Sequence, residues 1–278
     1  AHAEPVDAGW GPHGAIGLHG DLEPGRVQRT DQRLVELQER LPAGADHEPP
    51  SSRVVERPKV IYNETTRQFV MWMHIDREDY SYARAGVAVS KHPEGPYHYI
   101  RSIRPDGEMS RDMTLFKDDD GRAYLVYTSE NNNTMHVSLL KDDYLSPAGD
   151  WKRILIGQRR EAPAVFKHRG RYYLITSLCS GWDPNPANGA TADSMLGDWH
   201  QQGNPCTGPD AATTFHSQST FVLPLHPEQG TYLFMADRWN KTDLEQSRYC
   251  WLPLTVSGGR VEVTVDNSVV VEKRSAGP

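Results

Sequence analysis

Three acidic residues and one glutamine recur at similar intervals along this chain of 278 residues. Glu56, Asp112, Glu161 and Gln218 lie 56, 49 and 57 residues apart, each beside a run rich in β-branched and aromatic residues. Carboxyl groups that are held together can donate and accept protons in turn, which is what cleavage of a glycosidic bond requires. The spacing therefore indicates acid–base chemistry on a neutral, polar substrate.

The runs beside these four residues predict short antiparallel strands, because they alternate with turns rich in Gly, Asn, Asp and Pro. The predicted strands form four groups: 60–63, 69–74 and 86–90; 114–117, 123–129 and 135–140; 164–167, 172–177 and 190–194; and 220–225, 231–237 and 249–256. One small sheet per repeat is typical of a β-propeller, in which equivalent residues converge on the axis. We therefore predict an all-β propeller.

Residues 1–50 do not repeat this pattern. Trp10 is the only aromatic residue among them, and Leu34, Leu37 and Leu41 have the spacing of a short helix over residues 30–41. At the other end, residues 260–265 and 268–272 predict closing strands. We thus expect a divergent N-terminal segment, 1–50, in place of a regular first blade, and a propeller domain over residues 51–278.

Composition excludes several classes of protein. The net charge of −7 argues against a nucleic-acid partner, since binding to phosphates needs a basic surface. The longest apolar runs, such as 123–127, are too short to cross a membrane. Cys179, Cys206 and Cys250 allow at most one disulfide and match no zinc or redox motif, so they are expected to be small, partly buried residues.

Aromatic residues near predicted loops offer faces on which a sugar ring could stack. Trp72, Tyr80, Trp182 and Trp239 are candidates. Trp72 lies within a predicted strand, where a core position is favoured, whereas Trp182 lies in a Gly- and Pro-containing loop, where a core role and a ligand role are equally favoured.

Several short motifs together resemble glycoside hydrolase family 43, and within it the exo-β-1,3-galactanase subgroup. The resemblance runs from about Val54 to Val256. Its elements are Val54-Val55-Glu56-Arg57-Pro58-Lys59-Val60, Ser110-Arg111-Asp112, Glu161-Ala162-Pro163, Ser180-Gly181-Trp182, Ser217-Gln218 and Asp237-Arg238-Trp239. It implies a five-bladed propeller, with an atypical first blade here, and inverting, exo-acting release of galactose from β-1,3-galactan, the backbone of arabinogalactan.

The resemblance also implies catalytic roles. Glu161 matches the general acid, and Asp112 matches the residue that orients this acid and raises its pKa. Gln218 matches the unusual base of the subgroup, and Glu56 the acid beside that glutamine. An amide is a very weak base, so this role requires an imidic tautomer or a relay; the alternative is that Gln218 only binds substrate.

Six further residues are expected to contact substrate: Tyr80, Glu130, Cys179, Trp182, Asn185 and Trp239. Glu130 and Cys179 depart from the aspartate and threonine that the family usually has at these places. No cofactor is expected. A calcium ion near His216 is possible, although a lone histidine is more often a hydrogen-bonding residue.

Two other functions stay open: a non-catalytic carbohydrate-binding propeller or pseudoenzyme, and another family specificity, such as an arabinofuranosidase or galactofuranosidase. The expected partner is a β-1,3-galactan or arabinogalactan chain, with no membrane partner, and the protein is expected to be a monomer. We expect an extracellular location, although residues 1–21 lack the basic start and apolar stretch of a signal peptide.

Overall fold

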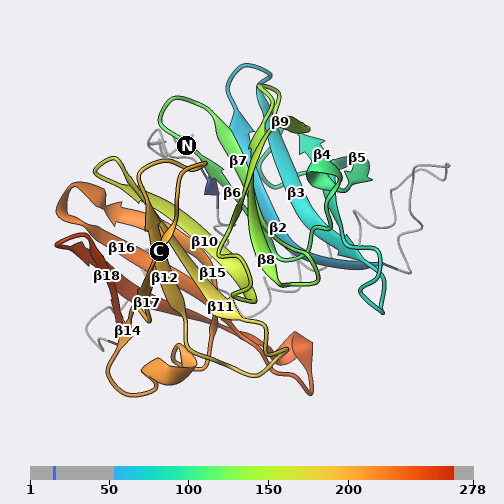
Figure 1. The fold of residues 1–278 in the computed structure, drawn as a ribbon. Coiled ribbons are helices and arrows are strands. Elements are labelled where there is room, and N and C mark those ends of the chain that lie inside the picture. The colour runs from blue at the N-terminus through green and yellow to red at the C-terminus, as the bar shows by residue number, and fades with distance from the viewer. Residues whose placement is uncertain (1–14, 17–52, 266–278) are drawn as a thin grey trace, which may run out of the picture. The chain divides into compact units, whose positions relative to one another are not determined.

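The computed structural model describes residues 15–16 and 53–265, and these form an all-β chain (Figure 1). Sheet 1 holds β1 (Ala15–Ile16), β2 (Val54–Asn63), β3 (Gln68–Asp76), β4 (Arg84–Ser90) and β5 (His98–Ile103). Sheet 2 holds β6 (Met113–Lys117), β7 (Ala123–Ser129), β8 (Thr134–Leu140) and β9 (Pro147–Ile154). Sheet 3 holds β10 (Arg160–His168), β11 (Arg171–Leu178), β12 (Asn188–Ala192) and β13 (His200–Gly203). Sheet 4 holds β15 (Gln218–His226), β16 (Thr231–Arg238), β17 (Arg248–Ser257) and β18 (Arg260–Thr264), with β14 (Cys206–Thr207) parallel to β18.

Four small sheets give the propeller-like pattern that the repeat predicted. The strands of sheets 1, 2 and 3 follow the chain order, whereas in sheet 4 β14 lies beside β18. The predicted count of five blades is not reached, because the described residues form four sheets. The divergent segment 1–50 with its helix over 30–41, and the strand over 268–272, lie outside the described residues apart from β1. Among the described residues, no helix has the length and apolar character needed to cross a membrane.

The apolar strands were predicted well, and the polar edge strands were missed. Each predicted strand within the described residues overlaps an observed strand. Strands β1, β5, β9, β13 and β14 were not predicted. The four residues of β13, His200–Gly203, are all exposed, and most of β9 is exposed as well. Such edge strands are held by hydrogen bonds to one neighbouring strand. Because they bury few side chains, their sequences lack the alternation of apolar and polar residues by which a strand is predicted.

The described chain divides into two compact units. The first comprises the described residues up to Arg111 together with Leu115–Val126 and Ser138–Trp151; the second comprises Asp112–Thr114, Tyr127–Val137 and the described residues from Lys152 onward.

In the first unit, β3 is buried on both faces. Phe69, Met71, Met73 and Ile75 pack on one face with residues of β2, β4 and β5. The other face carries Trp72, which is fully buried and donates its indole N–H to Tyr144 O at 2.8 Å. Trp72 is therefore a core residue, as its strand position favoured. Because side chains alternate along a strand, the polar His74 and Asp76 lie on the same face of β3 as Trp72.

In the second unit, sheets 3 and 4 pack through aromatic side chains. Phe166 stacks on Tyr173 with ring centroids 5.1 Å apart, and it contacts Tyr232 at 4.9 Å. Phe234 and Leu254 are fully buried in the same cluster. This core packs against β10 and β15, the strands that begin near Glu161 and Gln218.

Strands β2 and β10 each carry a candidate glutamate, and each strand becomes irregular directly after it. The register of β2 shifts after Glu56, where Arg57 has φ 54°, and that of β10 shifts after Glu161, where Ala162 has φ 52°. A positive φ is uncommon for residues other than glycine, and a bulge of this kind redirects a side chain at the end of a sheet. The side chains of Glu56 and Glu161 therefore each project from a strand directly before a bulge.

The glycine that ends the β15–β16 turn provides a test of the packing. Gly230 has φ +77°, and a Cβ there would lie 2.5 Å from Val256 O; Gly121 has φ +84° with nothing within 4 Å. Left-handed backbone costs an alanine about 1–2 kcal/mol, and overpacking adds roughly 1–3 kcal/mol. We expect Gly230→Ala to lower the free energy of unfolding in urea by more than Gly121→Ala does. Equal losses would contradict the close approach to Val256.

Candidate active site

The position of Glu161 depends on the backbone of Ala162. The Ala162 N–H donates to Asp112 Oδ2 at 3.1 Å, and its carbonyl oxygen accepts a hydrogen bond from Ser219 Oγ at 2.6 Å. Asp112 precedes β6 and its own carbonyl accepts from Thr128 N at 2.9 Å. Two side chains from other sheets therefore stabilise the positive φ that directs Glu161.

The contacts of the Gln218 amide include three hydrogen bonds. Its nitrogen donates to Glu161 Oε1 at 3.0 Å and to Ser177 Oγ at 2.9 Å, while its oxygen accepts from Trp239 Nε1 at 3.0 Å. An indole N–H can only donate, so the amide atom facing Trp239 must be the oxygen. The structure thus brings Asp112, Glu161 and Gln218 together in the second unit and fixes the orientation of the amide.

Direct contact between Glu161 and Gln218 differs from what an inverting site requires. Such a site holds its two catalytic groups about 6.5–9.5 Å apart, so that a water molecule and the sugar fit between them. In this structure the amide nitrogen itself lies beside Glu161 Oε1. Water can enter between the two groups only if their hydrogen bond opens.

A left-handed turn leads into Gln218. Thr214, Phe215 and His216 have φ between 52° and 59°, and Ser217 Oγ donates to Thr214 O at 2.6 Å. The His216 ring is exposed and lies 3.5 Å from Asp210 Oδ1. Because Ca²⁺ prefers oxygen ligands, the imidazole is poorly suited to the calcium ion considered from the sequence.

The pocket beside Gln218 is bordered by two tryptophans. Trp182 and Trp239 meet edge to face with ring centroids 5.3 Å apart, and Trp182 is 41% exposed. Asn185 also lines this pocket, but its amide bonds to both backbone groups of Leu178, at 2.8 and 3.0 Å. Trp182 can therefore offer an aromatic face to a ligand, whereas Asn185 holds its own loop.

Cys179 lies close to the proposed acid. Burial, followed by the charge of Glu161, a hydrogen bond to it and the charge of Asp112, raises the pKa of the Cys179 thiol to about 12. The thiol also donates to Asn132 O at 3.7 Å. Cys179 is thus a neutral, weak donor and a poor nucleophile. It and the two buried cysteines, Cys206 and Cys250, are free thiols.

Glu130 has its carboxylate occupied by protein groups. Arg153 binds it through two nitrogens, at 2.5 and 2.7 Å, and Thr134 Oγ1 and His136 Nε2 lie at 2.8 and 3.1 Å. The hydrogen bond from Arg153, with those from Thr134 and His136, lowers the pKa of Glu130 to about 2 against the effect of burial. A sugar hydroxyl would have to compete with these partners.

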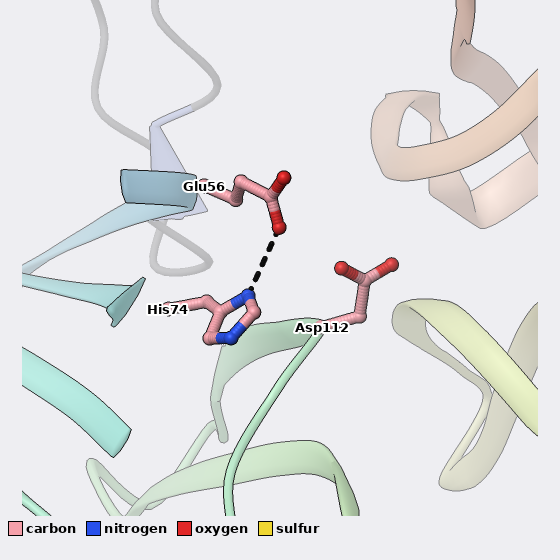
Figure 2. Close-up of side chains that lie close together, drawn as sticks. All are labelled: Glu56, His74 and Asp112. Atoms are coloured by element: carbon pink, nitrogen blue, oxygen red, sulfur yellow. Dashed lines mark hydrogen bonds and ion pairs between the residues drawn. The ribbon is translucent and has the colours of Figure 1, made fainter. Parts of the chain in front are cut away.

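The first unit holds the other two predicted residues. Figure 2 shows the Glu56 carboxylate hydrogen-bonded to the His74 ring, and the distance from Oε2 to Nδ1 is 3.0 Å. Glu56 Oε1 accepts from Tyr80 OH at 2.8 Å. His74 Nε2 lies 2.8 Å from Asp76 Oδ2. Burial would raise the pKa of Asp76, but hydrogen bonds from His74 and from two backbone N–H groups lower it.

Sequence reasoning missed four polar residues that support the candidate site residues: His74, Asp76, Ser177 and Ser219. All are buried. Two of them, His74 and Asp76, alternate within the otherwise apolar β3, and this placement of polar residues in an apolar strand was a signal that could have identified them. Ser177 and Ser219 lie in strands as well, but one small hydroxyl residue gives no distinctive pattern.

The chain is similar to known proteins of the family that its motifs resemble. A family model described as glycosyl hydrolases family 43 matches residues 60–237. A family 43 β-1,3-galactosidase solved with galactodeoxynojirimycin is 44% identical, with a TM-score of 0.75, over 80% of this chain and 78% of that one. No match is found among the curated protein sequences compared.

Two exo-β-1,3-galactanases are also similar. The one from Phanerochaete chrysosporium, solved with galactose, is 41% identical with a TM-score of 0.70, over 76% of this chain and 49% of that one. The one from Clostridium thermocellum is 39% identical with a TM-score of 0.72, over 79% and 50%. This chain therefore spans about half the length of these two relatives.

The ion pair of Glu130 predicts a pH-dependent contribution to stability. Because folding lowers the pKa of Glu130 from 4.5 to about 2, its contribution is present above pH 4.5 and is lost as the pH falls toward 2. We expect Arg153→Met to lower the free energy of unfolding by about 1 kcal/mol at pH 7 and by much less near pH 2. Lys152→Met, which breaks the exposed pair with Asp198, is the control and should cost little at either pH. A cost for Arg153→Met that is independent of pH would contradict this account.

Proposed function

The chain belongs to glycosyl hydrolase family 43, and from this we propose that it is an exo-acting hydrolase that releases galactose from β-1,3-linked galactan. The relatives above support the substrate, since they are described as β-1,3-galactosidases and exo-β-1,3-galactanases. The observation that carries the chemistry is the position of Glu161, whose backbone turn is fixed by Asp112 and whose carboxyl group is bonded to Gln218.

In the proposed reaction Glu161 is the general acid. It protonates the glycosidic oxygen as the bond to the anomeric carbon breaks, so that the leaving sugar departs as a neutral alcohol. Asp112 supports this step by holding the Ala162 turn, and its negative charge disfavours ionisation of nearby acids, as it does at Cys179.

Water attack from the opposite face would give inversion, with Gln218 as the group that directs the water. This requires substrate to open the hydrogen bond of 3.0 Å between Gln218 and Glu161. In the alternative, Gln218 keeps its amide form and only donates and accepts hydrogen bonds. Its three partners in the structure support this second role, because all of them match an ordinary amide.

The remaining assignments rest on the family resemblance together with local geometry. Glu56 and Tyr80 are proposed to contact the sugar, and their mutual hydrogen bond at 2.8 Å supports a joint role. Trp182 and Trp239 are proposed to border the sugar, which the exposed face of Trp182 supports. Glu130, Cys179 and Asn185 are proposed to act indirectly, since each is bonded to protein groups.

We further propose that the propeller has five blades, that arabinogalactan is the natural polymer, and that the protein acts outside the cell as a monomer. Family membership supports the blade count. The extracellular location follows from the size of the proposed substrate, since a long polysaccharide must be shortened before a cell can take it up.

Replacement of the general acid tests the proposal. We expect the purified chain to release galactose from β-1,3-galactan and Glu161→Gln to release it about 10²–10⁴-fold more slowly, because the glutamine cannot donate the proton. The loss should be much smaller on a dinitrophenyl galactoside, whose leaving group needs no protonation. Glu228→Gln, at an exposed surface residue, is the matched control and should retain activity.

Other outcomes would identify the other functions. Binding of galactan with no release of galactose would support a carbohydrate-binding propeller. Release of sugar from arabinofuranosides or galactofuranosides, but not from galactan, would support another specificity within the family. If Glu161→Gln lowered the rate of galactose release equally on β-1,3-galactan and on the dinitrophenyl galactoside, the role of Glu161 as the acid would be contradicted.

A further inference from the structure

We propose that Trp239 is a positioning residue that acts through Gln218 and decides which oxygen of Glu161 carries the catalytic proton. The inference rests on the proposed function, because it concerns the proton that Glu161 delivers. It adds a role for Trp239 beyond contact with the sugar.

Trp239 is the partner that fixes the orientation of the Gln218 amide. Ser177 cannot do so, because a hydroxyl group donates as readily as it accepts. Glu161 cannot do so either, since it accepts when ionised and donates when protonated. The indole N–H of Trp239 only donates, so it pairs with the amide oxygen and turns the amide nitrogen toward Glu161.

This orientation has a consequence for the acid. The Gln218 nitrogen donates to Oε1 of Glu161 at 3.0 Å. The hydroxyl oxygen of a protonated carboxyl group is a weaker acceptor than its carbonyl oxygen, so protonated Glu161 is favoured with its hydrogen on Oε2. The proton is therefore kept on the oxygen that does not accept from Gln218, and in the proposed reaction this oxygen delivers it to the glycosidic oxygen.

Several titratable or charged groups lie around this pair, and Asp183, His216 and Arg238 line the same pocket as Gln218 and Trp239. Cys179 follows β11 and is a neutral thiol, and the Asp112 carboxylate accepts from Ala162 N. Arg160, on β10, interacts electrostatically with Glu161, and its guanidinium donates to carbonyl groups of the β11 and β12 region. Asp237 lies opposite Gln218 in the β15–β16 register. A substitution at Trp239 replaces none of these titratable side chains, so we expect a change in pH dependence to report on the Gln218 amide.

Trp239→Phe is the direct test, because it keeps an aromatic ring and removes the N–H. The amide can then turn its oxygen toward Glu161 and accept the proton from it, which stabilises protonated Glu161 and directs its proton away from substrate. We expect kcat/KM on β-1,3-galactan to fall about tenfold. We also expect the alkaline limb of the pH profile of kcat/KM to move upward by about half to one pH unit.

Trp199→Phe is the matched control. Its indole N–H donates to Met195 O at 3.1 Å, also in the second unit but in a loop before β13. We expect the alkaline limb of this variant to stay where it is in the unmodified chain. Thermal unfolding of both variants, followed by circular dichroism, shows whether each is folded.

A second variant keeps the inference falsifiable if Trp239→Phe does not fold. Ser177→Ala removes one partner of the amide but leaves Trp239 to set its orientation, so its alkaline limb should not move even if kcat falls. A limb that moves in Ser177→Ala, or one that stays fixed in folded Trp239→Phe, would overturn the role of Trp239. Absence of galactose release by the unmodified chain would instead overturn the proposed function.

Discussion

The peptide backbone of Ala162 is the point on which the candidate active site of the second unit depends. A non-glycine residue at φ 52° is held there because its N–H donates to Asp112 and its carbonyl group accepts from Ser219. Ser219 directly follows Gln218 in β15, and Asp112 directly precedes β6. One strained residue thus links the starts of three sheets, and any shift in it would move Glu161, Gln218 and Asp112 relative to one another.

The polarity of each group decides the arrangement around Glu161. Gln218 has one orientation because a donor-only indole faces it, and that orientation presents N–H groups to Glu161 and Ser177. Each of these contacts is an ordinary hydrogen bond of modest net strength, but leaving a buried partner unpaired costs more than the bond itself contributes. The Gln218 amide therefore keeps one orientation because the flipped amide would leave a donor facing a donor, at Trp239, and this costs free energy.

Glutamates in this protein differ by their surroundings and not by their chemistry. Glu130 is bound by Arg153, Thr134 and His136, so its pKa falls to about 2 and it acts as a fixed negative charge. The Glu161 carboxyl group accepts from the Gln218 amide and lies near the neutral Cys179 thiol and the charged Arg160, while Asp112 accepts from the N–H of the next residue, Ala162. The two carboxyl groups therefore lie in different environments, and differences of this kind allow one type of side chain to take different roles in one protein.

The sequence by itself determined the all-β class, the apolar strands and the family, because these depend on alternation of side chains and on short motifs that survive without knowledge of contacts. It also indicated Glu56, Asp112, Glu161 and Gln218, from their repeated spacing, as candidate site residues, and their catalytic roles stay predictions. Tertiary structure alone decided which side chains are bonded to one another. It placed Glu130 in an ion pair and the Trp239 N–H on Gln218, and it showed the direct contact between Gln218 and Glu161. The physical reason is that hydrogen bonds between residues far apart in the chain depend on atomic positions within fractions of an ångström, and no local pattern of residues encodes those positions.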